Sequence, residues 1–463
     1  MKDHFVRVAS VTPEVTVADP AANRERIEEA MKDAAARGVK LAVFPELAIT
    51  GYTCGDLFLQ SSLIEAAAEE LNALVEASSG LDCLFFVGLP WQEKGRLYNV
   101  MAAIENGDLL ALVPKTFVPN YSEYYELRHF ACGWREPRYV SYTGPDGEEE
   151  EVLMGSDILF EASNCPGFTA CCEVCEDLWV PEPPSIRHAL NGATLIANGS
   201  ASPDGILKNE YLRNLVSMHS AKIVSAVVYA SAGPDESTSD LVFSGHDIIA
   251  ENGRILAESE VLTNGIITAE VDLERLVNER RRMRSIEMRD DDSYARVIFT
   301  FSELPDLELS REISASPFVP SDEAKRFERC EHILAIQSQG LAARMKKIRA
   351  KSAVVGISGG LDSTLALLVT VRAFERLGLD KKDILAVTMP CFGTTDRTYT
   401  NACTMARETG ATLLEIDIKE AVLKHFSDIG HDPSVHDTTY ENAQARERTQ
   451  VLMDLANSRG GLV

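Results

Sequence analysis

The stretch that decides the fold of this chain is FTACCEVCEDLW, residues 168–179. Its first seven residues are mostly apolar or small, which is typical of a buried strand. Cys175 follows directly, so the strand places a thiol at its carboxyl end. Layered α/β sheets usually build their sites at that edge. The stretch therefore predicts a buried strand that presents Cys175 to a site.

The sequence on either side repeats this alternation of short apolar runs and amphipathic helices. A first helix is predicted to begin with Asp19 as N-cap and Pro20 at its first position, and to end near Gly38. We expect its buried stripe to hold Ile27, Met31, Ala34 and Ala35. Further strands are predicted at 6–9, 41–44, 83–88, 109–113, 193–197 and 225–229. The pattern predicts a layered α/β domain over residues 1–275.

The pattern breaks down over residues 276–325, which carry a basic run, an acidic run and several prolines and serines. We interpret this segment as a linker. From residue 326 a second domain begins, with a helix at 327–348 and strands at 353–357, 384–388 and 413–416. Alternating strands and helices predict a parallel sheet. Because residues 460–463 read Gly-Gly-Leu-Val, like the start of another strand, we expect a C-terminal truncation and a second domain that is incomplete.

Composition excludes several classes of protein. The 463 residues include 71 acidic and 45 basic side chains, a net charge of −26, which argues against a nucleic-acid or acidic-membrane binder. No apolar run of about 18 residues predicts a membrane span, and the N-terminus does not resemble a signal peptide. The ten cysteines form neither a disulfide scaffold nor a zinc-type pair of CxxC units. We therefore expect a cytoplasmic protein.

Three reactive side chains follow predicted strands in the first domain: Glu46, Lys115 and Cys175. Together they could open a carboxamide. The thiolate would attack the amide carbon, the lysine would stabilise the thiolate and the oxyanion, and the carboxylate would move the proton. Each residue alone has a simpler interpretation. Glu46 and Lys115 could be solvated loop residues, and Cys175 could be a core cysteine or, with Cys172, a redox CxxC pair.

The order and flanks of these three residues resemble the nitrilase superfamily of carbon–nitrogen hydrolases. The resemblance covers residues 1–275 and implies a four-layer α-β-β-α sandwich. It also implies a second glutamate that orients the lysine and the substrate, for which Glu126 is the match.

Two further segments resemble the glutaminase domain of glutamine-dependent NAD synthetases. They are Cys-Glu-Asp-Leu-Trp at 175–179 and Asn-Gly-Ser-Ala-Ser-Pro at 198–203. The resemblance implies that Tyr121, Ser202 and Lys208, together with Glu126, bind glutamine. An ordinary Ser-Pro turn is the alternative interpretation of Ser202.

The second domain contains Ser-Gly-Gly-Leu-Asp-Ser at 358–363, between a strand and a helix. Glycines allow a phosphate chain to approach the backbone, hydroxyls and the helix N-terminus donate to it, and Asp362 can hold Mg²⁺. No lysine stands at the Walker position. The motif resembles the PP-loop of ATP pyrophosphatases, and the fold it implies is a Rossmann-like parallel sheet. The ATP-binding residues implied are Gly356, Ser358, Gly359, Gly360, Asp362, Ser363, Thr388 and Met389.

Residues 439–448 resemble the segment of NAD synthetases that binds deamido-NAD. The resemblance implies that Asn442 and Arg446 touch this dinucleotide, although a charged helix face also explains Arg446 and Arg448. Residues 391–395 depart from the family, which often has a serine-rich phosphate loop there.

The resemblance as a whole implies a ligase, a glutamine-hydrolysing NAD synthetase. Glutamine would supply ammonia for the ATP-dependent amidation of deamido-NAD to NAD, with release of AMP and pyrophosphate. The substrates would be glutamine, ATP and deamido-NAD, with Mg²⁺ and no tightly bound organic cofactor. A homo-oligomer is implied for the full-length form, and we expect the truncated synthetase half to be inactive.

Two other classes of protein remain open. One is a stand-alone amidase or nitrilase with a regulatory nucleotide-binding module, and the other is an interaction protein that retains an inactive enzyme fold. GMP and asparagine synthetases also join a glutaminase to a PP-loop domain, but their glutaminase halves do not use a Glu-Lys-Cys site.

Overall fold

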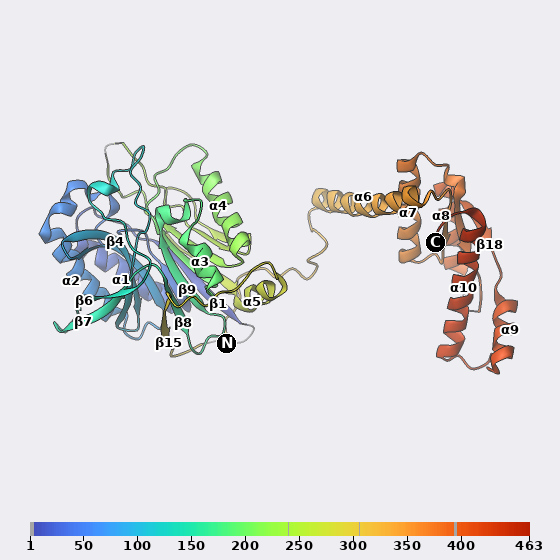
Figure 1. Ribbon diagram of the computed structural model, residues 1–463, viewed down its shortest axis with the longest axis horizontal. Coiled ribbons are helices and arrows are strands. Elements are labelled where there is room, and N and C mark those ends of the chain that lie inside the picture. The colour runs from blue at the N-terminus through green and yellow to red at the C-terminus, as the bar shows by residue number, and fades with distance from the viewer. Residues whose placement is uncertain (1–3, 239, 305, 393–395) are drawn as a thin grey trace. The chain divides into compact units, whose positions relative to one another are not determined.

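The computed structural model describes residues 4–238, 240–304, 306–392 and 396–463. The chain divides into two compact units, Met1–Ile313 and Ser314–Val463. In Figure 1 the first unit runs from blue to yellow and the second from orange to red.

The first unit is built on two mixed sheets. The order of the larger sheet is β14 (Gly265–Asp272), β1 (Phe5–Thr12), β2 (Val39–Val43), β3 (Leu84–Glu93), β4 (Arg96–Glu105), β5 (Asp108–Pro114), β7 (Glu149–Met154) and β6 (Arg138–Thr143). The order of the smaller sheet is β13 (Arg254–Glu258), β12 (Ile248–Glu251), β11 (Ala226–Ser231), β10 (Leu195–Ser200), β9 (Thr169–Val174), β8 (Ile158–Ala162) and β15 (Ala295–Phe299).

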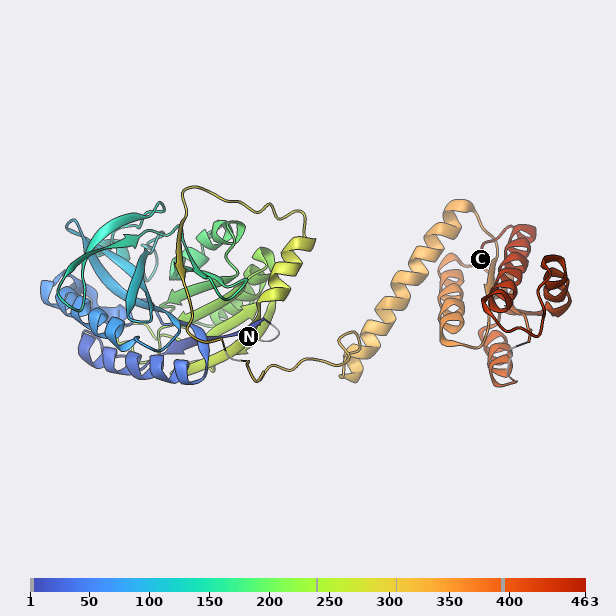
Figure 2. The same cartoon turned by 90° about the horizontal axis from the view of Figure 1, so that it is seen from below.

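Helices cover the outer face of each sheet. The α-helices of this unit are α1 (Pro20–Ala36), α2 (Ser61–Ala77), α3 (Pro184–Leu190), α4 (Lys208–Ile223) and α5 (Leu273–Arg282), and the 3-10 helices are η1 (Tyr52–Leu59), η2 (Glu126–Arg128) and η3 (Cys175–Leu178). One apolar core lies between the two sheets and includes Val8, Val43 and Val228. A second core packs α1 and α2 on the larger sheet, and a third packs α3 and α4 on the smaller one. The predicted α-β-β-α sandwich is confirmed, and Figure 2 shows the blue helices along one side of the sheets.

Helix α1 begins as its sequence predicts. The Asp19 carboxylate accepts a hydrogen bond from the Ala22 N–H, and Pro20 occupies the first turn, where its missing N–H has no cost. Ile27, Met31 and Ala34 are fully buried, whereas Ala35 is only half-buried.

The segment 276–325, which the sequence predicts to be a linker, is in part built into the first unit. Strand β15 pairs in parallel with β8, and Arg311 forms an ion pair with Glu251 at 2.9 Å. The composition of this segment does not predict its packing, because β15 is an edge strand with only Phe299 buried. After β15, Phe301 packs in the core between the sheets and Arg311 pairs with Glu251, and the structural unit extends to Ile313.

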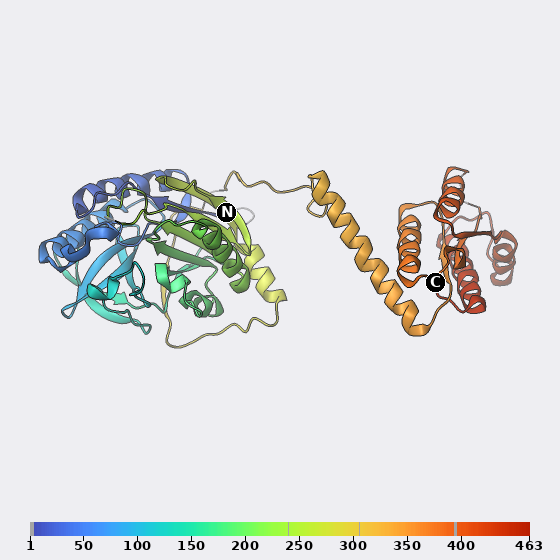
Figure 3. The ribbon, with the colours of Figure 1, turned by 90° about the horizontal axis from the view of Figure 1, so that it is seen from above.

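The second unit has a three-stranded parallel sheet in the order β16 (Ala353–Gly356), β17 (Ile384–Thr388) and β18 (Thr412–Glu415). The helices are α6 (Glu323–Ile348), α7 (Leu361–Leu377), η4 (Lys381–Asp383), α8 (Asp396–Thr409), α9 (Lys419–Ile429) and α10 (Thr438–Arg459). Side chains of α6, α7 and α8 pack on one face of the sheet and those of α9 and α10 on the other. The long orange helix in Figure 3 is α6. The predicted parallel sheet is confirmed.

Among the described residues, no helix combines the length and apolar character that crossing a bilayer requires.

Candidate active site

Cys175 lies at the end of β9, at the first residue of η3. Its φ of 45° is in the left-handed region, which is uncommon for a residue with a side chain and often marks a functional turn. The side chain is buried in the core between the two sheets, with 5% of its surface exposed. The turn therefore holds the thiol in an enclosed position instead of on the surface.

Lys115 lies at the centre of a buried charge cluster. It follows β5, and its side chain is 0% exposed. Its Nζ contacts Oε1 of Glu46 at 2.5 Å and both carboxylate oxygens of Glu126 at 2.8 Å. The structure therefore brings three predicted residues from separate parts of the chain into direct contact.

Cys175 interacts electrostatically with Glu46 and Lys115 of this cluster. Burial raises the pKa of the Cys175 thiol, the Glu46 charge raises it further, and the Lys115 charge opposes both. The pKa of Glu46 is also raised by burial and lowered by Lys115. A buried thiol with a raised pKa is protonated at neutral pH, so it needs a base before it can attack. Glu46 is the carboxylate whose charge acts most strongly on this thiol.

A backbone N–H closes the cluster from the side of β10. The Ala201 N–H acts on the Cys175 sulfur and lowers the pKa of the thiol. Ala201 directly follows β10 and precedes Ser202. Four strand ends therefore meet around the thiol: those of β2, β5, β9 and β10.

Asp177 connects the turn of Cys175 to the end of β5. This buried carboxylate accepts hydrogen bonds from the backbone N–H groups of Val174 at 3.0 Å, Thr116 at 3.3 Å and Phe117 at 2.8 Å. Val174 precedes Cys175, and Thr116 follows Lys115. One side chain thus fixes the backbones that carry Cys175 and Lys115. The sequence analysis did not identify this role.

Tyr52 forms a hydrogen bond with Glu126. Its hydroxyl donates to Oε1 of Glu126 at 2.8 Å. The backbone N–H of Tyr52 in turn donates to the buried carboxylate of Glu236 at 2.6 Å. No local sequence pattern identifies Tyr52, because its partners lie 74 and 184 residues away along the chain.

The three other predicted glutamine-binding residues lie near the same turn. The Tyr121 hydroxyl donates to Glu176 at 2.9 Å, and Lys208 Nζ lies 5.8 Å from the centre of the Trp179 ring. Burial lowers the pKa of Lys208, while the Cys175 charge raises it. Ser202 is buried, and its N–H donates to the Ser231 hydroxyl. Tyr121 is 54% exposed, in contrast to the buried side chains of the cluster.

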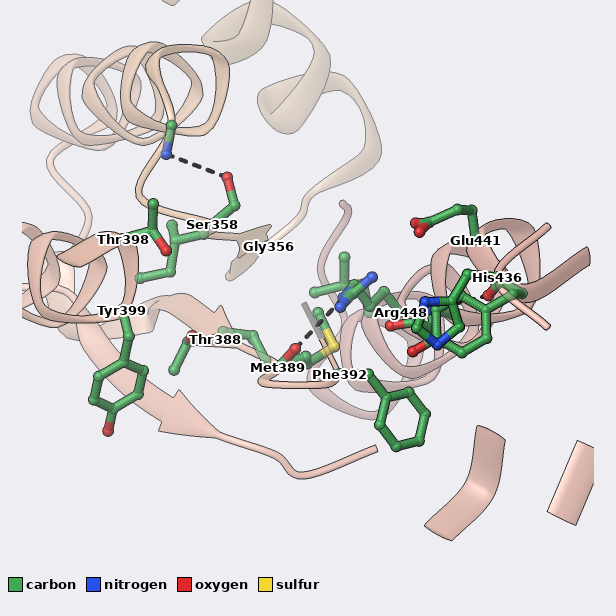
Figure 4. Close-up of a pocket in the computed structure, with 16 residues that line it drawn as sticks. Gly356, Ser358, Thr388, Met389, Phe392, Thr398, Tyr399, His436, Glu441 and Arg448 are labelled. Atoms are coloured by element: carbon green, nitrogen blue, oxygen red, sulfur yellow. Dashed lines mark hydrogen bonds between the residues drawn. The ribbon is translucent and has the colours of Figure 1, made fainter. Parts of the chain in front are cut away.

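The second unit contains a cavity of about 680 Å³ beside the PP-loop motif. Its wall is formed by the carboxyl ends of β16 and β17 and by α10 (Figure 4). Of the predicted ATP-binding residues, Gly356, Ser358, Gly360, Thr388 and Met389 line it. Gly359, Asp362 and Ser363 are outside this lining, and Asp362 lines a neighbouring apolar cavity.

The loop itself is preorganised. The Ser358 hydroxyl accepts the Gly360 N–H at 3.3 Å and lies 3.2 Å from the Ser363 hydroxyl. Gly359 has a φ of 79°, and a Cβ there would lie 2.1 Å from the Thr398 carbonyl oxygen. Only glycine fits this position.

One face of α10 borders the cavity and the other faces solvent. Tyr440, Glu441, Gln444 and Arg448 line the cavity, and Arg448 Nε donates to the Met389 carbonyl at 3.4 Å (Figure 4). The predicted dinucleotide-binding residues Asn442 and Arg446 are exposed and are not part of this lining. Their assignment stays a prediction. Of the phosphate-loop departure at 391–395, residues 393–395 lie outside the described part of the chain.

The sequence matches two families of known proteins. Residues 7–281 match the family described as carbon-nitrogen hydrolase, and residues 333–463 match NAD synthase. The glutamine-dependent NAD(+) synthetase of Mycobacterium tuberculosis (strain ATCC 25618 / H37Rv) is 41% identical over 472 residues, which cover 99% of this chain and 69% of that protein. The enzyme of the same name from Aquifex aeolicus is 28% identical, with coverages of 96% and 71%.

A solved structure supports the fold. The glutamine-dependent NAD(+) synthetase from Cytophaga hutchinsonii matches with a TM-score of 0.51 and 22% identity, over 99% of this chain and 74% of that one. Both domains and the identity across nearly the whole chain agree with the geometry above. The chain belongs to the glutamine-dependent NAD(+) synthetase family.

Proposed function

We propose that the first unit hydrolyses glutamine at Cys175, with Glu46 as general base and Lys115 as the stabiliser of the oxyanion. The observation that supports this most directly is the position of Lys115 Nζ, which lies between the carboxylates of Glu46 and Glu126 in the cluster that contains Cys175. A buried lysine with two anionic partners keeps its proton: their charges raise its pKa against the effect of burial. It can therefore stabilise negative charge on a reacting oxygen.

In the first half-reaction the Cys175 sulfur attacks the side-chain amide carbon of glutamine as Glu46 takes the thiol proton. The carbonyl oxygen becomes an oxyanion, which Lys115 and the backbone N–H groups of the Cys175 turn stabilise. The carbon–nitrogen bond then breaks, and Glu46 returns the proton to the leaving nitrogen. The products are ammonia and a thioester on Cys175.

In the second half-reaction Glu46 removes a proton from water, which attacks the thioester carbon. The carbon–sulfur bond breaks, glutamate is released, and Glu46 returns the proton to the Cys175 sulfur. We assign recognition of glutamine to Tyr121, Ser202 and Lys208, with Glu126 holding Lys115 in place. Lys208 supplies a positive charge for the substrate carboxylate, and its partial burial strengthens that attraction.

We assign ATP to the cavity beside the PP-loop in the second unit. Gly356, Ser358 and Gly360 would face the phosphates, and Thr388 and Met389 the adenine side. The nicotinate carboxylate of deamido-NAD attacks the α-phosphate of ATP to form an acyl-adenylate and release pyrophosphate. Ammonia from the first unit then displaces AMP. Asn442 and Arg446 are the proposed contacts to the dinucleotide.

Asp362 is the residue that we propose to hold Mg²⁺. Its carboxylate is exposed and has no partner among the described residues, and the hydroxyls of Ser358 and Ser363 are on the same loop. Hard oxygen ligands of this kind fit Mg²⁺, which usually binds one or two carboxylates together with substrate phosphates. The ion would neutralise phosphate charge.

We further propose a cytoplasmic location and a homo-oligomeric assembly. The composition and the family resemblance support these two assignments. Light scattering of the purified protein measures the second.

Labelling of the nucleophile tests the glutaminase proposal. The protein is treated with a glutamine-mimicking chloroketone, and the modified peptide is identified by mass spectrometry. We expect labelling of Cys175 that glutamine suppresses and acetamide does not. Cys172 is an internal control, because it is equally buried and lies three residues away. Labelling of Cys172, or labelling that glutamine leaves unchanged, would refute the assignment.

A stand-alone amidase is the main rival function. It predicts that simple amides are hydrolysed faster than glutamine and that they protect Cys175 better. Comparison of kcat/KM for glutamine, asparagine and acetamide decides between the two.

A further inference from the structure

Asn99 on β4 contacts two members of the Glu-Lys-Cys site. The residue is 1% exposed. Its side-chain Nδ2 donates to Oε1 of Glu46 at 2.5 Å. Its backbone carbonyl accepts the N–H of Lys115 at 2.8 Å. Neither the sequence motifs nor the proposed mechanism includes it.

The two oxygens of the Glu46 carboxylate have different surroundings. Oε1 accepts from both Lys115 Nζ and Asn99 Nδ2. Oε2 is buried and has no hydrogen-bond partner among the described residues. The carboxylate therefore has one anchored oxygen and one free oxygen, beside the Cys175 thiol whose pKa it raises.

Lys115 alone does not fix the orientation of the Glu46 carboxylate. Its ammonium group contacts both oxygens of Glu126 at 2.8 Å but only Oε1 of Glu46. The terminal torsion of a glutamate is broad, so a carboxylate held by one ammonium group can rotate. Asn99 adds a second, directional donor on the same oxygen and removes that freedom.

We propose that Asn99 is a positioning residue that fixes Glu46 so that Oε2 is the oxygen that exchanges the proton with Cys175. The inference rests on the proposed role of Glu46 as base. Oε2 accepts the thiol proton as the carbon–sulfur bond forms, and it gives the proton to nitrogen as ammonia leaves. Oε1 keeps both of its donors throughout, so the carboxyl group does not rotate between the two steps.

The orientation of the Asn99 amide agrees with this role. Its Oδ1 is buried and has no hydrogen-bond partner among the described residues. A flipped amide would place Oδ1 against the Glu46 carboxylate, which is repulsive. A buried acceptor without a partner costs free energy, so a position like this calls for an explanation. The hydrogen bond from Nδ2 to Glu46 explains why the amide keeps this orientation.

The test compares Asn99→Leu and Asn99→Asp with Asn191→Leu as the matched control. Asn191 is equally buried, and its amide bonds to Arg187 and Asp291, not to the site. For Asn99→Leu we expect kcat for glutamine hydrolysis to fall about tenfold to a hundredfold, as expected for a misplaced catalytic group. KM should change by less than about threefold, because the interaction acts on the chemical step.

The pH profile separates positioning from general damage. A donor to the charged form of a carboxyl lowers its pKa, so loss of Asn99 raises the pKa of Glu46. Glu46 must be ionised to act as base, and the acidic limb of the kcat profile should therefore move to higher pH. Asn99→Asp places a second carboxyl beside Glu46 and should move the limb further. Asn191→Leu should lower thermal stability and leave the limb unchanged.

Two outcomes would overturn the proposal. One is an acidic limb in Asn99→Leu and Asn99→Asp that coincides with that of the wild type. The other is a loss of kcat no larger than that of Asn191→Leu. If Asn99→Leu does not fold, Asn99→Asp, which matches asparagine in shape, gives the same comparison. A wild-type protein that is neither labelled at Cys175 nor hydrolyses glutamine would instead reject the proposed function itself.

Discussion

The charged residues of the two sites differ in burial and in pairing. In the first unit Lys115 is fully buried and pairs with two carboxylates of the same unit. In the second unit Ser358 and Asp362 are exposed, and the loop bonds mainly to itself. The charges of the first site are paired with one another without a ligand, whereas the second site exposes a carboxylate, Asp362, that has no partner among the described residues.

The difference follows from burial. A charge away from water must find its partner within the protein, because an unpaired buried ion is very costly. An exposed loop at a helix N-terminus has no such requirement, because water solvates its hydrogen-bond donors until a phosphate binds. The geometry of a buried site therefore indicates its chemistry directly, whereas that of an open site indicates mainly the kind of ligand it can accept.

Removal of Lys115 should produce the largest effect. Lys115→Met leaves Glu46 and Glu126 together without their cation. We expect a loss of about 3–5 kcal/mol in the free energy of unfolding, typical of a broken buried ion pair. Glutamine hydrolysis should fall at least about 10²–10³-fold, the usual effect of losing an oxyanion stabiliser. Denaturant unfolding and ammonia release measure the two.

Lys40→Met is the control for this variant. Lys40 pairs with Asp82 at 2.5 Å in the same unit, and both side chains are partly exposed. Its loss should cost less stability and leave the hydrolysis rate unchanged. Equal losses of activity in the two variants would mean that Lys115 acts only through folding.

The opposite behaviour is expected at the open site. Asp362→Asn removes an exposed carboxylate, so the free energy of unfolding should change by no more than about 0.5 kcal/mol. Affinity for ATP in the presence of Mg²⁺ should fall about tenfold or more, while affinity without Mg²⁺ should change little. A titration with a fluorescent ATP analogue measures both. Asp428→Asn on α9 is the control, since Asp428 is exposed and pairs with Lys424. Equal affinities with Mg²⁺ in the two variants would contradict the metal role.

The parts of the fold that the sequence predicted depend on local pattern. The apolar runs before Glu46, Lys115 and Cys175 form β2, β5 and β9, and Asp19 caps α1. In each case the residue type and its immediate neighbours determine the structure. The meeting of the three reactive side chains followed from their common place at strand ends.

What the sequence did not predict depends on contacts between distant residues. Asn99 meets Glu46 across 53 positions, and Asp177 meets Phe117 across 60. Strand β15 pairs with β8 from within a segment whose composition is that of a linker. On α10 the resemblance singles out residues 439–448, but only the packing shows that Gln444 and Arg448 line the cavity.

A moderate effect is expected from Asp177→Asn. The amide keeps the shape of the side chain, but its NH₂ group faces a backbone N–H and one of the three hydrogen bonds is lost. A buried donor without a partner costs about 1–3 kcal/mol. Because the bonds join the turns of Cys175 and Lys115, the rate of Cys175 labelling should also fall. Asp247→Asn, which removes a buried acceptor for Ser231 and Thr12, should lose stability alone. Unchanged labelling in Asp177→Asn would limit Asp177 to a structural role.

The smallest effect is expected at the exposed edge of the buried site. Tyr121→Phe removes a hydroxyl that donates to Glu176, while the ring and the exposed position remain. We expect KM for glutamine to rise about twofold to tenfold, the value of one hydrogen bond, with kcat unchanged. Tyr139→Phe on β6 is the control, because Tyr139 is 63% exposed and lies outside the site. Steady-state kinetics separate the two constants. A fall in kcat at constant KM would contradict this, because it would mean that Tyr121 acts on the chemical step together with the buried residues. The functional part of the site would then include an exposed side chain.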